Sequence, residues 1–142
     1  GIILNIASDL SVISPNQNVY KISKIKKSLQ PVKPIGYSII KHGIVGLTKS
    51  MAMELGDYGV RVNAICPGAV SGDRMKRVLS MESKASGISE DKLRRVYSEG
   101  TSMRSFVSEE NVADMALFLA SDQASMITGQ AMAVDGYTER TV

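Results

Sequence analysis

Cysteine, histidine and tryptophan are almost absent from this sequence. Cys66 is the only cysteine, so an intrachain disulfide is impossible, and the chain has one histidine, His42, and no tryptophan. One cysteine and one histidine do not supply the ligands of a structural zinc site, so we expect no metal. Because cysteine is scarce and the N-terminal residues show neither a basic stretch nor a signal-like cleavage site, we expect a reducing compartment, the cytoplasm.

Long apolar runs, a strong charge imbalance and glycine-rich phosphate loops are also missing. No apolar stretch is long enough to cross a bilayer, so we expect no membrane partner. The net charge of +3 is too small to indicate a nucleic-acid partner. The 142 residues contain no Gly-x-Gly-x-x-Gly and no Walker-type loop, which are the usual phosphate-binding motifs of nucleotide enzymes.

Three short apolar segments predict strands buried in one globular domain, in a chain whose hydrophobic content is 44%. Residues 2–6, 60–66 and 129–136 have the length and composition of strands, the last with its turn. Ser8 lies just past the first of them, and in open parallel sheets ligands bind at the carboxyl ends of strands. Ser8 is therefore a candidate active-site residue, and a turn residue or helix cap is the alternative interpretation.

Helix signals separate these strand segments. Pro34 suits the start of a helix, and the apolar spacing after it continues to about residue 55. Gly43 and Gly46 lie inside this helix, where small residues usually allow close packing against a neighbouring element. Ser89 and Ser108 are followed by acidic residues, which predicts that each serine caps a further helix.

Tyr37 and Lys41 form the most informative polar pair in the sequence. They lie four positions apart, so in a helix they share one face. At about 6 Å and an effective dielectric of about 20, the ammonium ion would stabilise a phenolate by roughly 3 kcal/mol. A phenol placed in this way can give or take a proton near neutral pH. A surface tyrosine and lysine at helical spacing is the alternative interpretation.

Four motifs, in order, resemble those of the short-chain dehydrogenase/reductase family. Residues 2–8, Ile-Ile-Leu-Asn-Ile-Ala-Ser, are similar to the family's strand-end Asn-Ile-Ser-Ser, whose last serine is catalytic. Tyr37 and Lys41 match its Tyr-x-x-x-Lys motif. Residues 67–68, Pro-Gly, match the turn that faces the nicotinamide, and residues 134–136, Val-Asp-Gly, match its closing motif. The resemblance covers nearly the whole chain.

The resemblance implies an α/β fold: the second half only of a doubly wound, Rossmann-type parallel sheet, in three αβα layers. Residues 1–142 are then the C-terminal part of a single domain. The family's glycine-rich loop and its catalytic asparagine are expected upstream. An intact mass near twice the calculated 15.3 kDa would show that this first half exists, whereas a mass of 15.3 kDa would favour a chain without it.

The resemblance also implies an oxidoreductase that uses NAD or NADP. Tyr37 is expected to act as the acid and base, Lys41 to favour its ionised form and hold the nicotinamide ribose, and Ser8 to polarise the substrate oxygen. The expected cofactor contacts are Tyr37, Lys41, Pro67, Gly68, Val70 and Ser71, the last standing where the family often has a threonine.

Two segments depart from the family pattern. The insert of about 10–34, between the serine and the tyrosine, is longer than usual and has no acidic residue. Its lysines are Lys21, Lys24, Lys26, Lys27 and Lys33. A solvated basic loop is one interpretation, and a lip that attracts an anionic substrate is the other. The family closes over its substrate in the region of about 69–105, which is expected to set specificity.

The expected partners are a small-molecule carbonyl or alcohol substrate and further copies of the chain, because the family mostly forms dimers and tetramers. An alternative function is that of a truncated, non-catalytic remnant that acts as an interaction module. Its motivation is the missing phosphate-binding half, without which a sheet edge needs covering by a partner. Whether an upstream segment exists distinguishes the two.

Overall fold

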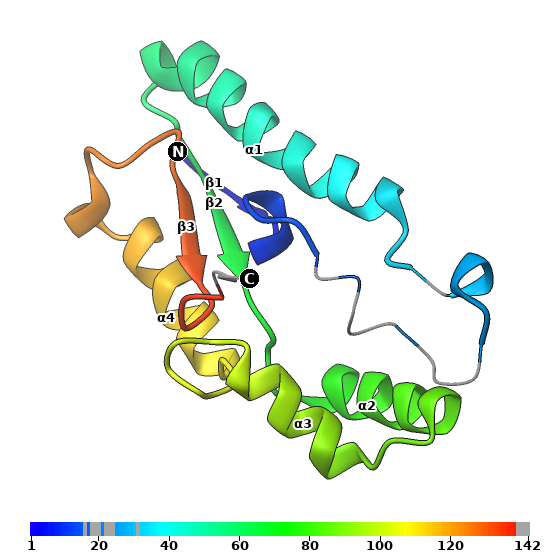
Figure 1. Ribbon diagram of the computed structural model, residues 1–142. Coiled ribbons are helices and arrows are strands. Elements are labelled where there is room, and N and C mark those ends of the chain that lie inside the picture. Colours follow the sequence, from blue (N-terminus) through cyan, green and yellow to red (C-terminus); the bar gives the residue numbers. More distant parts are fainter. Residues whose placement is uncertain (16, 18–20, 22–24, 31, 139–142) are drawn as a thin grey trace.

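The computed structural model describes residues 1–15, 17, 21, 25–30 and 32–138 (Figure 1). Three parallel strands form the centre of this described part: β1 (Ile2–Ile6), β2 (Arg61–Pro67) and β3 (Ala131–Val134), in the order β1-β2-β3. Because the strands are parallel, their carboxyl ends lie at one edge of the sheet. The three strands predicted from the apolar runs are confirmed.

Within the described residues, four α-helices connect and cover the strands: α1 (Ile35–Leu55), α2 (Asp73–Ser86), α3 (Glu90–Glu99) and α4 (Glu109–Ala120). Their starts follow the signals in the sequence. Pro34 is the N-cap residue of α1, and the Ser89 hydroxyl accepts a hydrogen bond from the first turn of α3. Ser108 and Asn111 form a reciprocal capping box at the start of α4. The predicted helices are confirmed.

The sheet lies between helices on its two faces (Figure 1). Ala64 and Cys66 of β2 are fully buried on one face, where Ile44 of α1 packs against them. Ile65 is buried on the other face, where it packs with Leu119 of α4. Because alternate residues of a strand point to opposite faces, β2 contributes to both cores. The α/β class and the three-layer αβα arrangement of a Rossmann-type half sheet are confirmed.

Asn63 joins β2 to the segment that leads into β3. Its side chain is fully buried between these elements. Asn63 Nδ2 donates to the carbonyl oxygen of Ile127 at 2.8 Å, and Asn63 Oδ1 accepts from the backbone N–H of Gln130 at 3.0 Å. Buried amides need such partners, so this side chain fixes the path of the chain just before β3.

The outward face of α1 carries large apolar side chains with no cover among the described residues. Their exposed fractions run from 53% to 85%, and they are Ile35, Ile39, Ile40, Leu47 and Met53. Gly43 and Gly46 lie on the same helix, and a Cβ added at either would meet nothing within 4 Å among the described residues. The close packing expected around these two glycines is therefore absent within the described chain.

The basic insert of about 10–34 lies only partly within the described residues. Lys21, Lys26 and Lys27 are exposed, and a short 3-10 turn, η3 (Lys27–Leu29), precedes α1. Lys24 lies outside the described residues. A search of the described helices found none with both the length and the apolar character needed to cross a membrane.

Candidate active site

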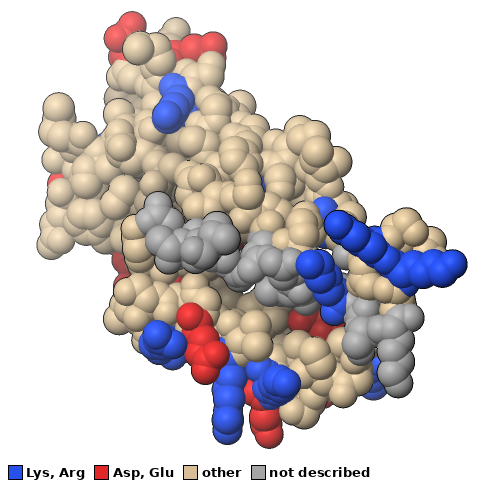
Figure 2. Space-filling view, in the orientation of Figure 1, with Lys and Arg blue, Asp and Glu red and all other residues tan. Residues whose placement is uncertain are grey.

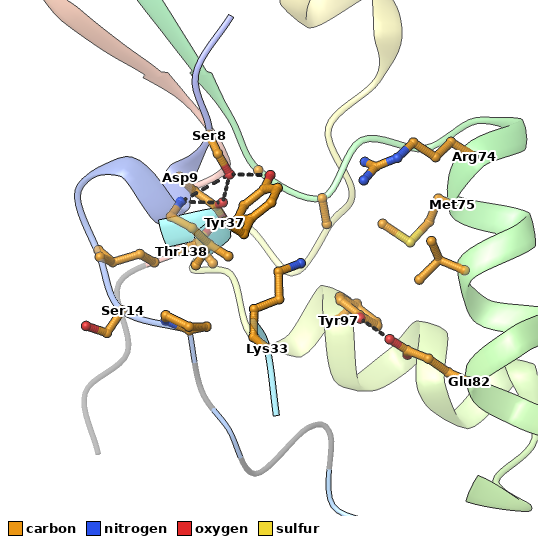
Figure 3. A pocket seen from close by; sticks show the side chains of 16 residues that line it. Ser8, Asp9, Ser14, Lys33, Tyr37, Arg74, Met75, Glu82, Tyr97 and Thr138 are labelled. Carbon is orange, nitrogen blue, oxygen red and sulfur yellow. Dashed lines mark hydrogen bonds between the residues drawn. The ribbon is translucent and has the colours of Figure 1, made fainter. Parts of the chain in front are cut away.

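A cavity of about 190 Å³ lies at the carboxyl edge of the sheet (Figure 3). The residues that follow the three strands line it, and these include Ser8, Gly68 and Thr138. Its other walls come from the start of α1 and from α2 and α3. The cavity therefore lies where parallel α/β sheets bind their ligands. The region of about 69–105, expected to face the substrate, supplies Ala69, Arg74, Met75, Val78, Glu82 and Tyr97 to its wall.

Ser8 is a helix cap, which was one of its two interpretations, and it also lines the cavity. It follows β1, is buried, and is the N-cap residue of the 3-10 helix η1 (Asp9–Ser11). Ser8 Oγ accepts a hydrogen bond from the N–H of Leu10 at 3.2 Å, and the N–H of Ser8 donates to Ser11 Oγ at 3.0 Å. The cap holds the Ser8 hydroxyl at the cavity wall, so the helix-cap interpretation and the active-site interpretation are compatible.

A row of three oxygens crosses the cavity wall. The Tyr37 hydroxyl donates to Ser8 Oγ at 3.4 Å, and Ser8 Oγ donates to Asp9 Oδ1 at 2.8 Å (Figure 3). The first bond is long, and the Ser8 proton is directed at Asp9 rather than at the cavity. A substrate oxygen can enter between Ser8 and Tyr37, provided that the Ser8 hydroxyl turns from Asp9 toward it.

Two ammonium groups approach the ring of Tyr37. Lys41 Nζ lies 5.9 Å from the ring centroid and donates to the carbonyl oxygen of Ile6 at 3.0 Å. Lys33 Nζ is closer, at 4.3 Å, within the range of a cation–π contact. Lys33 lines the cavity and Lys41 does not. Tyr37 therefore lies in a positively charged setting.

The remaining candidate cofactor-binding residues, at the end of β2 and just after it, differ in whether they line the cavity. Gly68 lines the cavity, whereas Pro67, Val70 and Ser71 do not. Val70 forms a parallel bridge with Val107. The backbone N–H and the hydroxyl of Ser71 both donate to the carbonyl oxygen of Val107, at 2.7 and 3.1 Å. The Ser71 hydroxyl is thus used inside the chain and has only acceptor capacity left for a ligand.

Packing against another part of the chain explains why residue 68 is a glycine. A Cβ at this position would lie 2.9 Å from Cα and 2.8 Å from Cβ of Asp135, just after β3. The resemblance places this glycine in the turn that faces the nicotinamide. The structure adds a nearer cause, because the backbone after β3 passes against Gly68 and leaves no space for a side chain.

Cys66 lies at the end of β2 beneath this site and is buried. Burial raises the pKa of the Cys66 thiol, and the negative charges of Asp9 and Asp135 add to the effect. The backbone at Ser8 and the charge of Lys41 act in the opposite direction without cancelling it. Cys66 is therefore a neutral core residue and is unsuited to act as a nucleophile.

Several cavity residues were not identified from the sequence as site residues. Asp9 holds the Ser8 hydroxyl, and Glu82 Oε1 accepts a hydrogen bond from the Tyr97 hydroxyl at 2.8 Å, joining α2 to α3. Arg74 projects from the first turn of α2. Their spacing matches no motif, so the sequence offered no signal for them. A search for clusters of three or more metal-ligating side chains, limited to the described residues, found none.

Comparisons with known proteins agree with this geometry. The family model described as enoyl-(acyl carrier protein) reductase matches residues 26–138. A D-beta-hydroxybutyrate dehydrogenase from Rhizobium meliloti is 40% identical over 101 residues, which are 70% of this chain and 39% of that protein. The chain thus spans less than half the length of this curated relative.

Solved structures extend the likeness to the fold. A short chain dehydrogenase family protein from Francisella tularensis has a TM-score of 0.78 at 25% identity, covering 96% of this chain and 50% of that one. A 4-hydroxyisoleucine dehydrogenase solved with NADH has a TM-score of 0.74 at 26% identity, covering 97% and 46%. The family match, the parallel sheet and the serine–tyrosine pair at its edge lead to one conclusion: this chain belongs to the short-chain dehydrogenase/reductase family.

Proposed function

We propose that the protein to which this chain belongs is an oxidoreductase that uses NAD or NADP to interconvert an alcohol and a carbonyl compound. The observation that carries the proposal is the Tyr37 hydroxyl, 3.4 Å from Ser8 Oγ at the carboxyl edge of a parallel sheet. The named relatives are dehydrogenases, and one solved relative holds NADH. These names support the reaction class.

In the proposed reaction, Tyr37 transfers the proton and Ser8 donates a hydrogen bond to the substrate oxygen. In the reducing direction, Tyr37 gives its phenolic proton to the substrate oxygen, and in the oxidising direction it takes the proton back. Ser8 turns its hydroxyl to donate to the same oxygen, which orients it and stabilises its developing charge. Lys41 places its ammonium group 5.9 Å from the ring centroid of Tyr37, on the same helix. When bound, the nicotinamide supplies or accepts the hydride.

The residues present fit a nicotinamide cofactor in part. An ammonium group has three donors, and Lys41 uses one of them on Ile6, which leaves two for ribose hydroxyls. Pro67 ends β2, and Gly68 after it lines the same cavity as Tyr37. Ser71 fits less well, because its hydroxyl already donates to Val107. We therefore propose Tyr37, Lys41, Pro67, Gly68 and Val70 as cofactor contacts, and Ser71 as an acceptor only.

The test is the substitution Tyr37→Phe in the full-length protein, with bound cofactor measured alongside. We expect turnover to fall at least about 10²-fold, because the acid and base is lost while the ring remains. Tyr58→Phe is the matched control, since Tyr58 is 79% exposed and distant in sequence from the site. Near-normal turnover in Tyr37→Phe, with cofactor still bound, would refute the assignment.

The second candidate is a non-catalytic interaction module. It is favoured by one observation, which is that β1 lies at the sheet edge and pairs only with β2 among the described residues. An unpaired edge is a ready site for another chain. Titration of the full-length protein with NADH and NADPH separates the candidates. A protein that binds neither cofactor is the module, and one that binds either is the proposed oxidoreductase.

A further inference from the structure

The cavity holds two acidic side chains that are already occupied by hydrogen bonds from the protein. Asp9 Oδ1 accepts from Ser8 Oγ at 2.8 Å and from the N–H of Leu10 at 2.7 Å. Glu82 Oε1 accepts from the Tyr97 hydroxyl at 2.8 Å. Both carboxylates therefore already accept hydrogen bonds from residues of the cavity wall. This makes them less available to a cationic ligand.

The same cavity holds two cations without a counter-ion. Lys33 and Arg74 both line it, and within the described residues neither forms an ion pair. Lys33 is half-buried, and its backbone N–H, not its ammonium group, bonds to Gln17. Arg74 is exposed. Lys33 is partly removed from water without an anion, which is unfavourable, so the arrangement is suited to an anionic ligand that also reaches Arg74.

The two cations reach the cavity from different elements. Lys33 precedes α1, whereas Arg74 lies in the first turn of α2. In Figure 3 their charged groups point into the same space, with Tyr37 and Ser8 on the side of the sheet. Figure 2 shows Lys and Arg side chains gathered over the part of this face where α2, α3 and the segment before α1 lie. An anion between the two would receive charge-assisted hydrogen bonds from both.

From this pairing we infer that the substrate carries an acidic group, a carboxylate or a phosphate, held jointly by Lys33 and Arg74. Because Lys33 Nζ lies 4.3 Å from the ring centroid of Tyr37, the acidic group lies close to the carbon that reacts. The substrate is thus a small oxo or hydroxy acid, or the phosphate ester of a small ketone or alcohol. This inference rests on the proposed function, since it assigns the substrate of the same site.

The experiment compares ligands that differ only in the acidic group. Acetoacetate is paired with its methyl ester, and dihydroxyacetone phosphate with dihydroxyacetone. Binding to the full-length protein is measured by calorimetry with oxidised cofactor present, so that no ketone is reduced. In at least one pair, we expect the charged member to bind at least about 10-fold more tightly, because two charge-assisted contacts are gained. The pair that shows the difference identifies a carboxylate or a phosphate.

Variants connect the preference to the two cations. We expect Lys33→Gln and Arg74→Gln each to remove most of the difference between charged and neutral ligands. The controls are Lys27→Gln, an exposed lysine of the same basic segment, and Arg77→Gln, an exposed arginine on the same helix. They should leave the difference unchanged. Equal binding within both pairs, no binding at all, or a preference that survives both cavity variants would overturn the inference.

The two proposals fail separately. Reduction of the uncharged ketones that depends on Tyr37, without any preference for the acidic members, would leave the oxidoreductase standing and remove the acidic substrate. Tight binding of an acidic ligand that depends on Lys33 and Arg74, without reduction of any ketone, would support the acidic ligand and refute the oxidoreductase.

Discussion

At the residue scale, the Ser8 hydroxyl belongs both to a helix cap and to the wall of the cavity. It accepts a hydrogen bond from Leu10, donates to Asp9 and receives the Tyr37 hydroxyl. Ser11 completes the same capping box from the other side, by accepting from the N–H of Ser8. The two serines therefore share the structural role, and only Ser8 faces the tyrosine.

This difference allows a comparison of Ser8→Ala with Ser11→Ala. Both should lower the free energy of unfolding by about 0.5–2 kcal/mol, because each removes one bond of the cap. Only Ser8→Ala should also lower turnover, by about 10²–10³-fold, because it removes a donor to the substrate oxygen. Urea denaturation and steady-state kinetics on the full-length protein measure the two effects. Equal losses of turnover in both variants would assign Ser8 to the cap alone.

The buried thiol of Cys66 predicts how the free energy of unfolding changes with pH. Burial, followed by the charges of Asp9 and Asp135, raises the pKa of its thiol above the ordinary value of 9.0. The folded protein then keeps a proton that the unfolded chain loses, so the free energy of unfolding falls as the pH rises above about 9. We expect this fall to be steeper than in Cys66→Ala by up to about 1.4 kcal/mol per pH unit. Urea denaturation between about pH 8 and 10 tests it, and parallel curves for both proteins would contradict it.

At the element scale, capping residues determine where helices such as α4 begin. The contact of β2 with the segment before β3 depends instead on residues that are distant in sequence. Ser108 caps α4 through a bond to the N–H of Asn111, as its position before two acids predicted. The first turn of α4 also lowers the pKa of Glu110, through its own backbone N–H and then the Ser108 hydroxyl. Asn63 gave no such signal, because its partners Ile127 and Gln130 are distant in sequence.

We expect Asn63→Ala to lower the free energy of unfolding by about 2–4 kcal/mol. The substitution leaves the carbonyl oxygen of Ile127 and the N–H of Gln130 without their partner in two partly buried hydrogen bonds, and each such loss costs about 1–3 kcal/mol. Gln130→Ala is the control, since it removes a neighbouring exposed amide and should change stability by less than about 0.5 kcal/mol. Chemical denaturation of the full-length variants gives both values, and similar values would show that the Asn63 bonds contribute little.

At the scale of the whole molecule, the outward face of α1 leaves large apolar side chains exposed in the described part of the chain. Ile39, Ile40 and Leu47 are more than half exposed, and Gly43 and Gly46 lie among them with no neighbour in the described chain. Contiguous apolar patches of this kind are typical of subunit interfaces. We propose that a second copy of the protein covers this face, in a dimer or tetramer.

Sedimentation of the full-length protein tests this proposal. We expect a mass of two or four subunits, and a shift toward the single subunit in Leu47→Lys, because a charge cannot be buried in an apolar interface without a partner. Lys49→Glu is the control on the same helix, where an exposed charge is exchanged for another. A wild-type protein that sediments as one subunit would contradict the proposal.

The sequence by itself determined the helices and strands and indicated the candidate pair, Ser8 and Tyr37. Strand length, apolar spacing and capping residues are local properties, so β1, β2, β3 and the helix starts could be predicted before any coordinates. The serine after β1 and the tyrosine in α1 were identified by motif, and the position of Ser8 at the strand end already indicated the edge of the sheet.

Only the tertiary structure decided what surrounds that pair. Lys33 precedes α1, whereas Arg74 and Glu82 both lie on α2. Packing brings these two segments to one cavity, and no spacing rule links Lys33 with the two residues of α2. The same holds for Gly68, whose close neighbour Asp135 follows another strand. Contacts between distant segments depend on how the two faces of the sheet are filled, and the order of residues along one segment does not contain that information.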